Sequence, residues 1–268
     1  MAAFIDSHTH LYLRGSEELQ AMARAGVRAA ALCAYVPVKP SGAATLLDLF
    51  RWLVEKEPPR FEACGLRALP VVGIHPRCIP AEGLDEVLEA VDRLLAGRPV
   101  RPEDDERAAV ALGEVGLDLA TAEEKEVLKA QLKLASARQA PVVVHTPRKD
   151  KVRVLGELLA VLEASEVDPA TVVIDHLTVD LVGRVRERGF KAGLTVQPGK
   201  LSVEEVVSIV RAHGPDGLLV DSDAALEPAD VLAVPKVAKR LEEVGFDASS
   251  IARVSGENAA AFFALEKK

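Results

Sequence analysis

Short apolar runs alternate with longer segments of helical periodicity along the whole chain. Runs rich in Val, Ile, Leu and Ala predict eight strands, at 3–7, 27–33, 68–74, 108–114, 141–145, 171–175, 190–195 and 217–221. Apolar residues spaced three and four positions apart predict helices between them, near 16–25, 43–57, 84–96, 122–139, 149–165, 178–187, 202–213 and 228–244. Repeated strand–helix units are typical of parallel α/β folds.

Eight such units favour a closed barrel over an open, doubly wound sheet. The strand around 142–145, which reads VVVH, is apolar on both faces, as expected for a parallel strand buried between layers. The length of 268 residues agrees, because a (β/α)8 barrel usually needs about 250. We therefore expect an α/β protein made of a single (β/α)8 TIM barrel over residues 1–268, with an additional C-terminal helix near 257–265.

Composition narrows the classes of function. The formal net charge of −8 argues against a protein that coats nucleic acid or anionic membrane through bulk charge, although a local basic patch is compatible with it. No uncharged apolar stretch of about 18 residues is present, and the start of the chain does not resemble a signal peptide. Three cysteines without CxxC spacing fit a reducing compartment. We expect a cytoplasmic protein that does not span a membrane.

Most of the histidines fall where a barrel builds its active site. Of the six, five end or follow a predicted strand, and these are His8, His10, His75, His145 and His176. The carboxyl ends of barrel strands form the catalytic face. His8 and His10 are two positions apart, so their side chains point to the same side of a strand. The sixth, His213, is expected to cap or cover a helix end.

Two carboxylates complete a candidate ligand set. Glu114 lies between glycines in LGEVGLD, where we expect the glycines to let backbone approach a ligand, and Asp223 follows the last strand. A carboxylate in an apolar segment is costly unless a cation or hydrogen bonds compensate it. Imidazole and carboxylate together suit Zn, Mn, Fe or Mg, and six ligands suffice for two ions that share a bridging carboxylate.

Six segments resemble the TatD-like branch of the metal-dependent amidohydrolase superfamily. They are FIDSHTHL, VVGIHPR, LGEVGLD, PVVVHTPR, VIDHL and LVDSDA, and they occur in the family's order over residues 4–224. The ending GENAAAFFAL is similar to the family's closing helix. The resemblance implies a divalent-metal-dependent hydrolase, because several family members are deoxyribonucleases that use such ions.

The resemblance also implies roles for single residues. The implied metal ligands are His8, His10, Glu114, His145, His176 and Asp223. His8 and His10 would hold one ion, His145 and His176 the other, and Glu114 would bridge them. Asp223 would bind the first ion and accept a proton from the attacking water, which makes Asp223 and Glu114 the implied catalytic residues. Asp221 matches an acidic position that supports the site without binding metal.

The chain departs from the family pattern in two places. Ala225 stands where the family has proline, and the glycine–serine segment after the sixth strand is not recognisable in HLTVDLVG. The segment GLTVQPGK follows the seventh strand instead. These departures indicate a divergent TatD-related subgroup, and they concern the substrate more than the metal chemistry.

The expected loops after the strands gather cations. They are Arg14, Lys39, Arg77, Arg148, Lys149, Lys151 and Lys200. Phosphate is the substrate group that Arg and Lys bind best. We expect His75 and Arg77 to hold non-bridging phosphate oxygens, with Arg148 and Lys151 as further substrate-binding residues.

The resulting hypothesis is a two-metal phosphoesterase with TatD-like deoxyribonuclease activity. Its cofactors would be two divalent ions (Zn, Mg or Mn), and its partner a phosphate-containing substrate such as a single-stranded DNA end. Only 4% of residues are aromatic, which counts against base stacking and keeps a small phosphate ester open. Two further hypotheses are hydrolysis of a lactone or amide and a non-catalytic metal-binding role. No oligomeric state is predicted.

Overall fold

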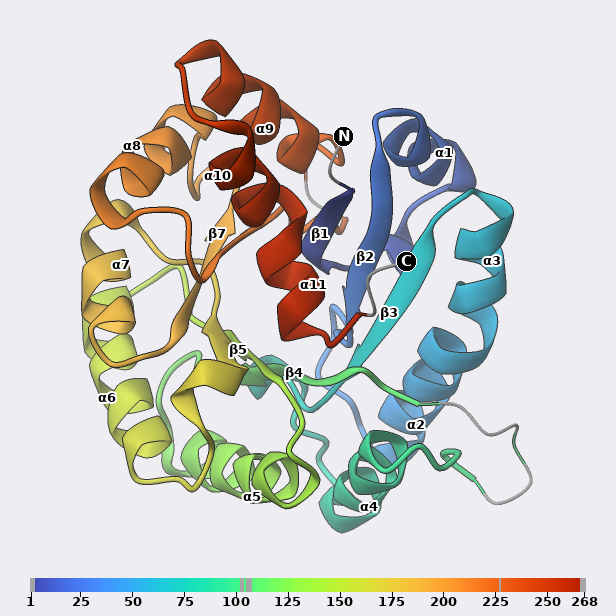
Figure 1. The fold of residues 1–268 in the computed structure, drawn as a ribbon. Helices are drawn as coiled ribbons and strands as arrows, with labels where there is room; N and C mark the ends of the chain where they lie inside the picture. Colours follow the sequence, from blue (N-terminus) through green and yellow to red (C-terminus); the bar gives the residue numbers. More distant parts are fainter. Residues whose placement is uncertain (1–2, 102–103, 105–107, 227, 266–268) are drawn as a thin grey trace. The chain divides into compact units, whose positions relative to one another are not determined.

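Eight parallel strands form the sheet in the computed structural model, which describes residues 3–101, 104, 108–226 and 228–265. The strands are hydrogen-bonded in sequence order from β1 to β8, and a helix lies between each consecutive pair along the chain (Figure 1). Their bounds are β1 Phe4–Thr9, β2 Val27–Cys33, β3 Arg67–Val72, β4 Ala111–Gly116, β5 Val142–His145, β6 Val172–Ile174, β7 Lys191–Thr195 and β8 Leu218–Asp221. This order confirms the predicted (β/α)8, or TIM-barrel, fold.

The strand predictions differ from the structure mainly at their ends. β4 was expected to end at Glu114, but it continues to Gly116, which pairs with His145 of β5. His75 was expected at the end of a strand, but β3 ends at Val72 and His75 caps the short 3-10 helix Pro76–Cys78. Apolar runs locate the strands, whereas their last residues depend on pairing that the sequence does not show.

The chain divides into two compact units. The first consists of residues 1–32, 59–69 and 173–268, and the second of residues 33–58 and 70–172. In the first unit, the backbone N–H of His10 donates to Ala224 O (2.8 Å) and that of Asp223 donates to His8 O (3.0 Å). These bonds join the end of β1 to the segment that follows β8, so the last strand meets the first.

The helices of the first unit are α1 Ser16–Arg24, α3 Glu57–Ala63, α7 Val179–Arg186, α8 Val203–His213, α9 Ala233–Glu243, α10 Ala248–Ala252 and α11 Asn258–Phe262. The additional C-terminal helix is confirmed by α11, which packs against β1. The sequence missed α10, whose N-terminus is capped by Asp247 accepting from the N–H of Ser250 (2.9 Å). His213 is the last residue of α8, as expected for a helix-end histidine.

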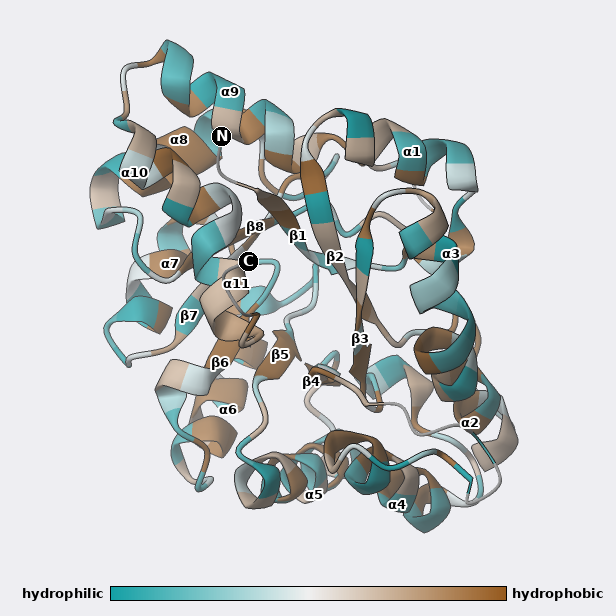
Figure 2. Cartoon of the chain, turned by 45° about the vertical axis from the view of Figure 1, so that its right-hand side comes forward, coloured by the Kyte–Doolittle hydropathy of each residue, from teal (hydrophilic) through white to brown (hydrophobic). Residues whose placement is uncertain are grey.

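The second unit contains α2 Ala43–Arg51, α4 Leu84–Leu95, α5 Ala122–Arg138 and α6 Lys151–Glu163. The apolar side of α4 consists of Val87, Ala90, Val91 and Leu94, all buried at the spacing of one helical face. Figure 2 shows hydrophobic and hydrophilic stretches alternating along α4 and α5. α4 contacts α2, α5 and β4, so its apolar side packs within this unit.

The helix predicted over 43–57 does not end there. A π-helical turn, Trp52–Lys56, follows α2 and leads directly into α3, so helical backbone continues to Ala63. Pro58 and Pro59 directly follow the π-helical turn, so helical backbone continues through two residues that lack a backbone N–H. The predicted end near residue 57 is therefore too early.

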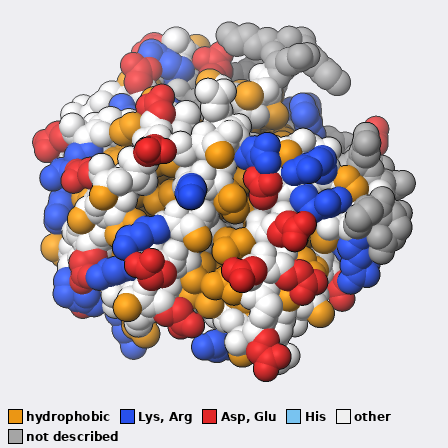
Figure 3. All heavy atoms as spheres, turned by 90° about the horizontal axis from the view of Figure 1, so that it is seen from below, with side chains coloured by type: hydrophobic (Ala, Val, Ile, Leu, Met, Phe, Trp, Pro, Cys, Tyr) orange, Lys and Arg blue, Asp and Glu red, His pale blue; other side chains and the backbone are white. Residues whose placement is uncertain are grey.

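Charged side chains of both signs are interspersed on the surface. Lys and Arg lie among Asp and Glu over the face seen in Figure 3, with hydrophobic side chains between them. Among the described residues, none of the helices combines the length and the apolar character that crossing a bilayer requires.

Candidate metal centre

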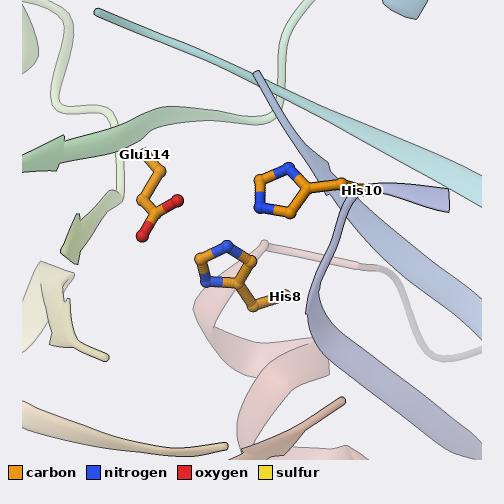
Figure 4. Close-up of side chains that lie close together, drawn as sticks. All are labelled: His8, His10 and Glu114. Carbon is orange, nitrogen blue, oxygen red and sulfur yellow. The ribbon is translucent and has the colours of Figure 1, made fainter. Parts of the chain in front are cut away.

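His8 and His10 lie at the end of β1 with their imidazole rings close together. His8 is inside the strand and His10 follows it directly, and both are buried. Their ring centroids are 5.2 Å apart at an interplanar angle of 73° (Figure 4). The two-residue spacing therefore places both side chains on the same side of the strand, as the alternation of strand side chains predicts.

Both rings turn Nε2 toward one carboxylate oxygen. Oδ1 of Asp223 lies 3.3 Å from Nε2 of His10 and 3.9 Å from Nε2 of His8. Burial disfavours the ionised form of Asp223, but the hydrogen bond with His10 and the charge of Lys200 outweigh it and hold its pKa well below the usual range. Asp223 is consequently an anion at neutral pH, which metal ligation requires.

The opposite nitrogen of His8 is held by another side chain. Nδ1 of His8 lies 2.7 Å from Oδ2 of Asp175, and both side chains are almost completely buried. Gly193 of β7 makes this contact possible, because a Cβ there would come within 1.4 Å of Oδ1 of Asp175. A carboxylate on Nδ1 fixes the ring and its tautomer so that Nε2 presents its lone pair, as in ligand histidines.

His176 follows β6 and joins the same cluster. Its ring centroid is 5.1 Å from that of His8. Its Nδ1 lies 2.8 Å from Oγ1 of Thr195, which in turn donates to Oδ2 of Asp221 (3.2 Å). The chain of contacts from Asp221 through Thr195 to His176 agrees with the supporting role expected for Asp221.

Two of these candidate ligands have left-handed backbone. The φ angle is 61° at His176 and 44° at Asp223. This conformation costs a residue other than glycine roughly 1–2 kcal/mol, so surrounding contacts must maintain it. At Asp223 the backbone N–H donates to His8 O (3.0 Å), and Nε2 of Gln197 donates to the carbonyl oxygen of Asp223 (3.1 Å).

A second cluster of potential ligands belongs to the second unit. Glu114 extends from β4 (Figure 4), and its Oε1 lies 2.7 Å from Nδ1 of His145 on β5. Nε2 of His145 lies 3.4 Å from Oδ1 of Asp118, in the loop after β4. The hydrogen bond with His145, together with the charge of Arg77, lowers the pKa of Asp118. Asp118 is a residue that the sequence analysis missed.

His75 and Arg77 accompany this second cluster. Nε2 of His75 lies 3.9 Å from Oε2 of Glu114, and its Nδ1 accepts the backbone N–H of Arg77 (3.0 Å). In a neutral imidazole an accepting Nδ1 leaves the proton on Nε2, so His75 presents an N–H and not a lone pair. The Arg77 side chain is 52% exposed, 3.6 Å from Asp118 and over the ring of Tyr35.

The glycines on either side of Glu114 allow two strands to lie close together. A Cβ at Gly116 would lie 2.5 Å from His145 O, and one at Gly113 would lie 2.8 Å from Val143 O. Both glycines therefore let β5 approach β4 closely, with Gly116 opposite His145. The expectation that they let backbone approach a ligand stays a prediction.

Helix α5 orders the loops that carry these groups. Gln131 is buried and bonds both backbone groups of Ile74, accepting from N (2.7 Å) and donating to O (3.1 Å). The carboxylate of Glu124 accepts from the backbone N–H groups of residues 118, 119 and 120 at 2.8–3.2 Å. Gln131 thus holds the residue before His75, and Glu124 holds Asp118. In the sequence, these are polar residues on the inner face of an otherwise apolar helix pattern.

The predicted substrate-binding residues that follow β5 differ in exposure. Arg148, in the loop, is exposed, whereas Lys151, the first residue of α6, is half-buried, and its Nζ donates to Oγ1 of Thr146 (2.9 Å), the residue next to His145. Arg14, another cation of the predicted group, pairs with Glu18 (2.9 Å) and donates to Ala225 O. The side chain of Arg14 therefore binds groups of its own unit.

A buried acidic group lies beneath the first cluster. Asp6 accepts from Oγ of Ser222 (2.6 Å) and from its backbone N–H (3.0 Å). Burial raises the pKa of Asp6 to about 7 in spite of these bonds. Burial, together with the neighbouring Asp175, also raises the pKa of Asp221 well above its usual range.

The donor atoms of the first cluster fit a divalent metal ion, since one ligand atom each from His8, His176 and Asp223 lie within 4.8 Å of one another. One atom each from His75, Glu114 and His145 also lie this close together, but His75 presents an N–H, which leaves Glu114 and His145 as the candidate ligands of the second cluster. Imidazole nitrogen with carboxylate oxygen is a donor set for Zn, Mn or Fe. Nδ1 of His8, fixed by Asp175, gives that histidine the support on its far nitrogen that ligands have.

Comparisons with known proteins agree with this chemistry. The family model described as TatD related DNase matches residues 5–264. A protein of Methanocaldococcus jannaschii named as an uncharacterized metal-dependent hydrolase is 34% identical over 97% of this chain and 100% of its own length. The crystal structure of a TatD-like protein from Archaeoglobus fulgidus is 35% identical, covers 98% of this chain and 100% of its own, and superposes with a TM-score of 0.82.

A more distant structure shares the fold alone. The phosphotriesterase homology protein of Escherichia coli is 16% identical, with coverage of 98% and 99% and a TM-score of 0.72. The M. jannaschii and A. fulgidus proteins, by contrast, match along their entire length, and the family model covers both ligand clusters. We conclude that this chain belongs to the TatD related DNase family and is a metal-dependent hydrolase.

Proposed function

We propose that the protein is a two-metal phosphoesterase with deoxyribonuclease activity on single-stranded DNA ends. The proposed ligands are His8, His10, Glu114, His145, His176 and Asp223, with Glu114 shared by both ions. The observation that carries the proposal is the convergence of Nε2 of His8 and of His10 on Oδ1 of Asp223, with Nδ1 of His8 held by Asp175. The family description, TatD related DNase, supports DNA as the substrate class.

Divalent ions bound at these ligands would promote ionisation of water and stabilise negative charge that develops on phosphoryl oxygens. Asp223 would accept the proton of the attacking water, since its Oδ1 faces the candidate metal ligands His8 and His10. His75 presents its Nε2–H as a donor to a substrate oxygen. Arg77, Arg148 and Lys151 bind the phosphate charge from solvent-accessible positions.

The test is release of nucleotides from end-labelled single-stranded DNA. Metal-stripped protein receives Mg, Mn or Zn, and Asp223→Asn, prepared identically, controls for contaminating nuclease. We expect metal-dependent release by the wild type and a loss of about 100-fold or more in the variant. Equal release by both proteins, or none with any ion despite measured metal binding, contradicts the nuclease assignment.

Hydrolysis of a small phosphate ester is the second candidate function, and the surroundings of the two tyrosines favour it. Tyr12 is buried, with its hydroxyl 3.3 Å from Nδ1 of His10, so its ring is closed to a nucleobase. Tyr35 lies beneath the guanidinium of Arg77. A panel of phosphate monoesters, a diester and a lactone, assayed with the same control variant, separates these classes. Turnover of monoesters without DNA cleavage selects the small substrate, and turnover of the lactone alone excludes both phosphate classes.

A further inference from the structure

The loop between β7 and α8 turns a lysine inward. Lys200 N donates to Gln197 O (2.9 Å), Gln197 N to Leu201 O (3.2 Å), and Leu201 N to Thr195 O (3.1 Å). These bonds fold Gln197–Lys200 into a closed turn. The turn leaves only 8% of the Lys200 side chain exposed, in contrast to the two preceding residues, which are exposed.

Two side chains of this turn form hydrogen bonds with Asp223. Nζ of Lys200 donates to Oδ2 of Asp223 and lies 3.0 Å from Nδ1 of His176, while Nε2 of Gln197 donates to the backbone oxygen of Asp223 (3.1 Å). The other carboxylate oxygen, Oδ1, faces His10 and His8. One oxygen of the Asp223 carboxylate therefore binds an ammonium group, and the other faces the candidate metal ligands.

An ammonium group in this position does not help the chain to hold metal. It shares the negative charge of a ligand that a divalent cation also needs, and like charges at such short range repel strongly when partly shielded from water. Burying an ammonium group also costs free energy that one shared carboxylate repays incompletely. Both costs fall when an anion enters the site, because it attracts the ammonium group and the metal ions together.

We propose that Lys200 is a specificity-determining residue that binds the anionic oxygen of the substrate and selects phosphoryl esters over neutral esters and lactones. This inference rests on the proposed phosphoesterase function and names the residue that confers the preference. The ammonium group, held by the turn, requires little reordering when the phosphoryl group arrives, and a pre-organised cation binds more tightly than a mobile surface lysine.

A purely positioning role predicts the opposite response of metal affinity. If Lys200 only orients Asp223, its removal loosens a ligand and metal affinity falls. If Lys200 binds the substrate anion, its removal leaves metal affinity equal or higher, because a competing positive charge has gone, and phosphate affinity falls. The two roles are therefore separated by measuring both affinities on the same variants.

The experiment uses the full chain saturated with Mn²⁺, with inorganic phosphate as the probe in isothermal titration calorimetry. The variants are Lys200→Met and Lys200→Arg, and Lys239→Met on α9 is the matched control, since its side chain is 76% exposed. Chelator competition gives the Mn²⁺ affinity, and thermal unfolding verifies that each variant folds. We expect Lys200→Met to bind phosphate about 10- to 100-fold more weakly with undiminished Mn²⁺ affinity, and Lys200→Arg to retain part of the phosphate binding.

Three results overturn the proposal. The first is that Lys200→Met binds phosphate as tightly as the wild type. The second is that its Mn²⁺ affinity falls in parallel with its phosphate affinity. The third is that Lys239→Met loses as much phosphate affinity as Lys200→Met. A wild type that binds phosphate through Lys200 but hydrolyses no phosphate ester would refute the phosphoesterase function and leave the anion site standing. Should Lys200→Met not fold, Lys200→Arg and Lys200→Gln provide the same comparison.

Discussion

The two ligand clusters are built by different means. In the first unit, side chains contact Nδ1 of the imidazoles, with Asp175, just after β6, on His8 and Thr195 of β7 on His176. In the second unit, a helix holds the loops instead, through Gln131 on Ile74 and Glu124 on the turn at Asp118. Contacts on the ring set the tautomer of a ligand, whereas contacts on the backbone set only its place. The rings of the second cluster are contacted as well, since Nδ1 of His145 lies 2.7 Å from Oε1 of Glu114 and Nδ1 of His75 accepts the N–H of Arg77 (3.0 Å). What distinguishes the second cluster is the additional support that a helix gives to the backbone of its loops.

The clusters also differ in charge. In the first cluster, the almost buried side chain of Lys200 pairs with Asp223. The same unit contains three further acids that are fully or nearly buried, namely Asp6, Asp175 and Asp221. The second has its guanidinium, Arg77, half exposed beside Asp118. Buried charges interact strongly and are sensitive to the removal of one partner, while exposed pairs contribute little. Substitutions should consequently have larger effects around the first cluster, apart from those at a shared ligand.

The largest effect is expected where one residue serves both ions. Glu114→Gln removes the charge that the proposal assigns to bridging, so occupancy of both ions should fall and hydrolysis should drop about 1000-fold or more. Metal content by mass spectrometry after dialysis against a weak chelator measures this. Metal content equal to that of the wild type would remove the bridging role, and loss of one ion only would restrict Glu114 to the second cluster.

We expect the buried carboxyl group of Asp6 to make the free energy of unfolding depend on pH. The pKa of Asp6 is about 7 in the native protein against 3.8 as the ordinary value, so the native state keeps its proton where the unfolded chain has lost it. This contribution to the free energy of unfolding therefore declines as pH rises from about 4 to about 7, by at most about 4 kcal/mol.

Asp6→Asn, a neutral mimic that can still bond Ser222, should flatten that part of the profile. Urea unfolding of the metal-stripped proteins at pH 5 and pH 8 makes the comparison. The same pH dependence in wild type and variant would show that Asp6 is ionised in the native state.

Paired substitutions compare support on an imidazole ring with support on the backbone of a loop. Asp175→Asn keeps the shape behind His8 but removes the charge, so metal affinity should fall about 10- to 100-fold. Gln131→Met leaves the backbone groups of Ile74 unsatisfied, so the free energy of unfolding should fall by about 1–3 kcal/mol with little change in metal affinity. Chelator competition and urea unfolding on both variants give the answer, and a reversed pattern would refute the distinction.

The smallest effect is expected at the accessible edge of the second cluster. Lys151→Ala removes an ammonium group that donates to Thr146, and KM for phosphate esters should rise only a few-fold, since an ion pair that a partly solvated lysine forms with phosphate contributes about 0–1 kcal/mol. Lys129→Ala on α5, where the lysine side chain is 56% exposed, is the control for net charge. A rate undiminished relative to that control excludes Lys151 from substrate binding.

Much of the fold could be predicted from the sequence, because the strands and helices follow the periodicity of hydrophobic residues along the chain. All eight strands lie within a few residues of their predicted positions. The helix predictions were wrong at the continuation through α3 and at α10, which was missed. The candidate ligands were located by their place at strand ends, since His8, His10, His145, His176 and Asp223 lie at or just beyond β1, β5, β6 and β8.

The supporting residues could not be found in this way. Asp175 precedes a predicted ligand and resembles any strand-end acid until Gly193 is seen to make room for it. Gln131 and Glu124 are two helical turns apart on α5, a spacing that does not reveal which loops they hold. Lys200 was one of seven loop cations, and the closed turn Gln197–Lys200 distinguishes it from the rest.

The sequence by itself determined the order of strands and helices, the family and the candidate metal ligands, because these depend on periodicity and on residue type along the chain. Tertiary structure decided which nitrogen of each histidine faces the carboxylates, which acids are forced toward neutrality, and which lysine is drawn inward. Those properties depend on burial and on distances between residues far apart in sequence, and such distances exist only once the chain has folded.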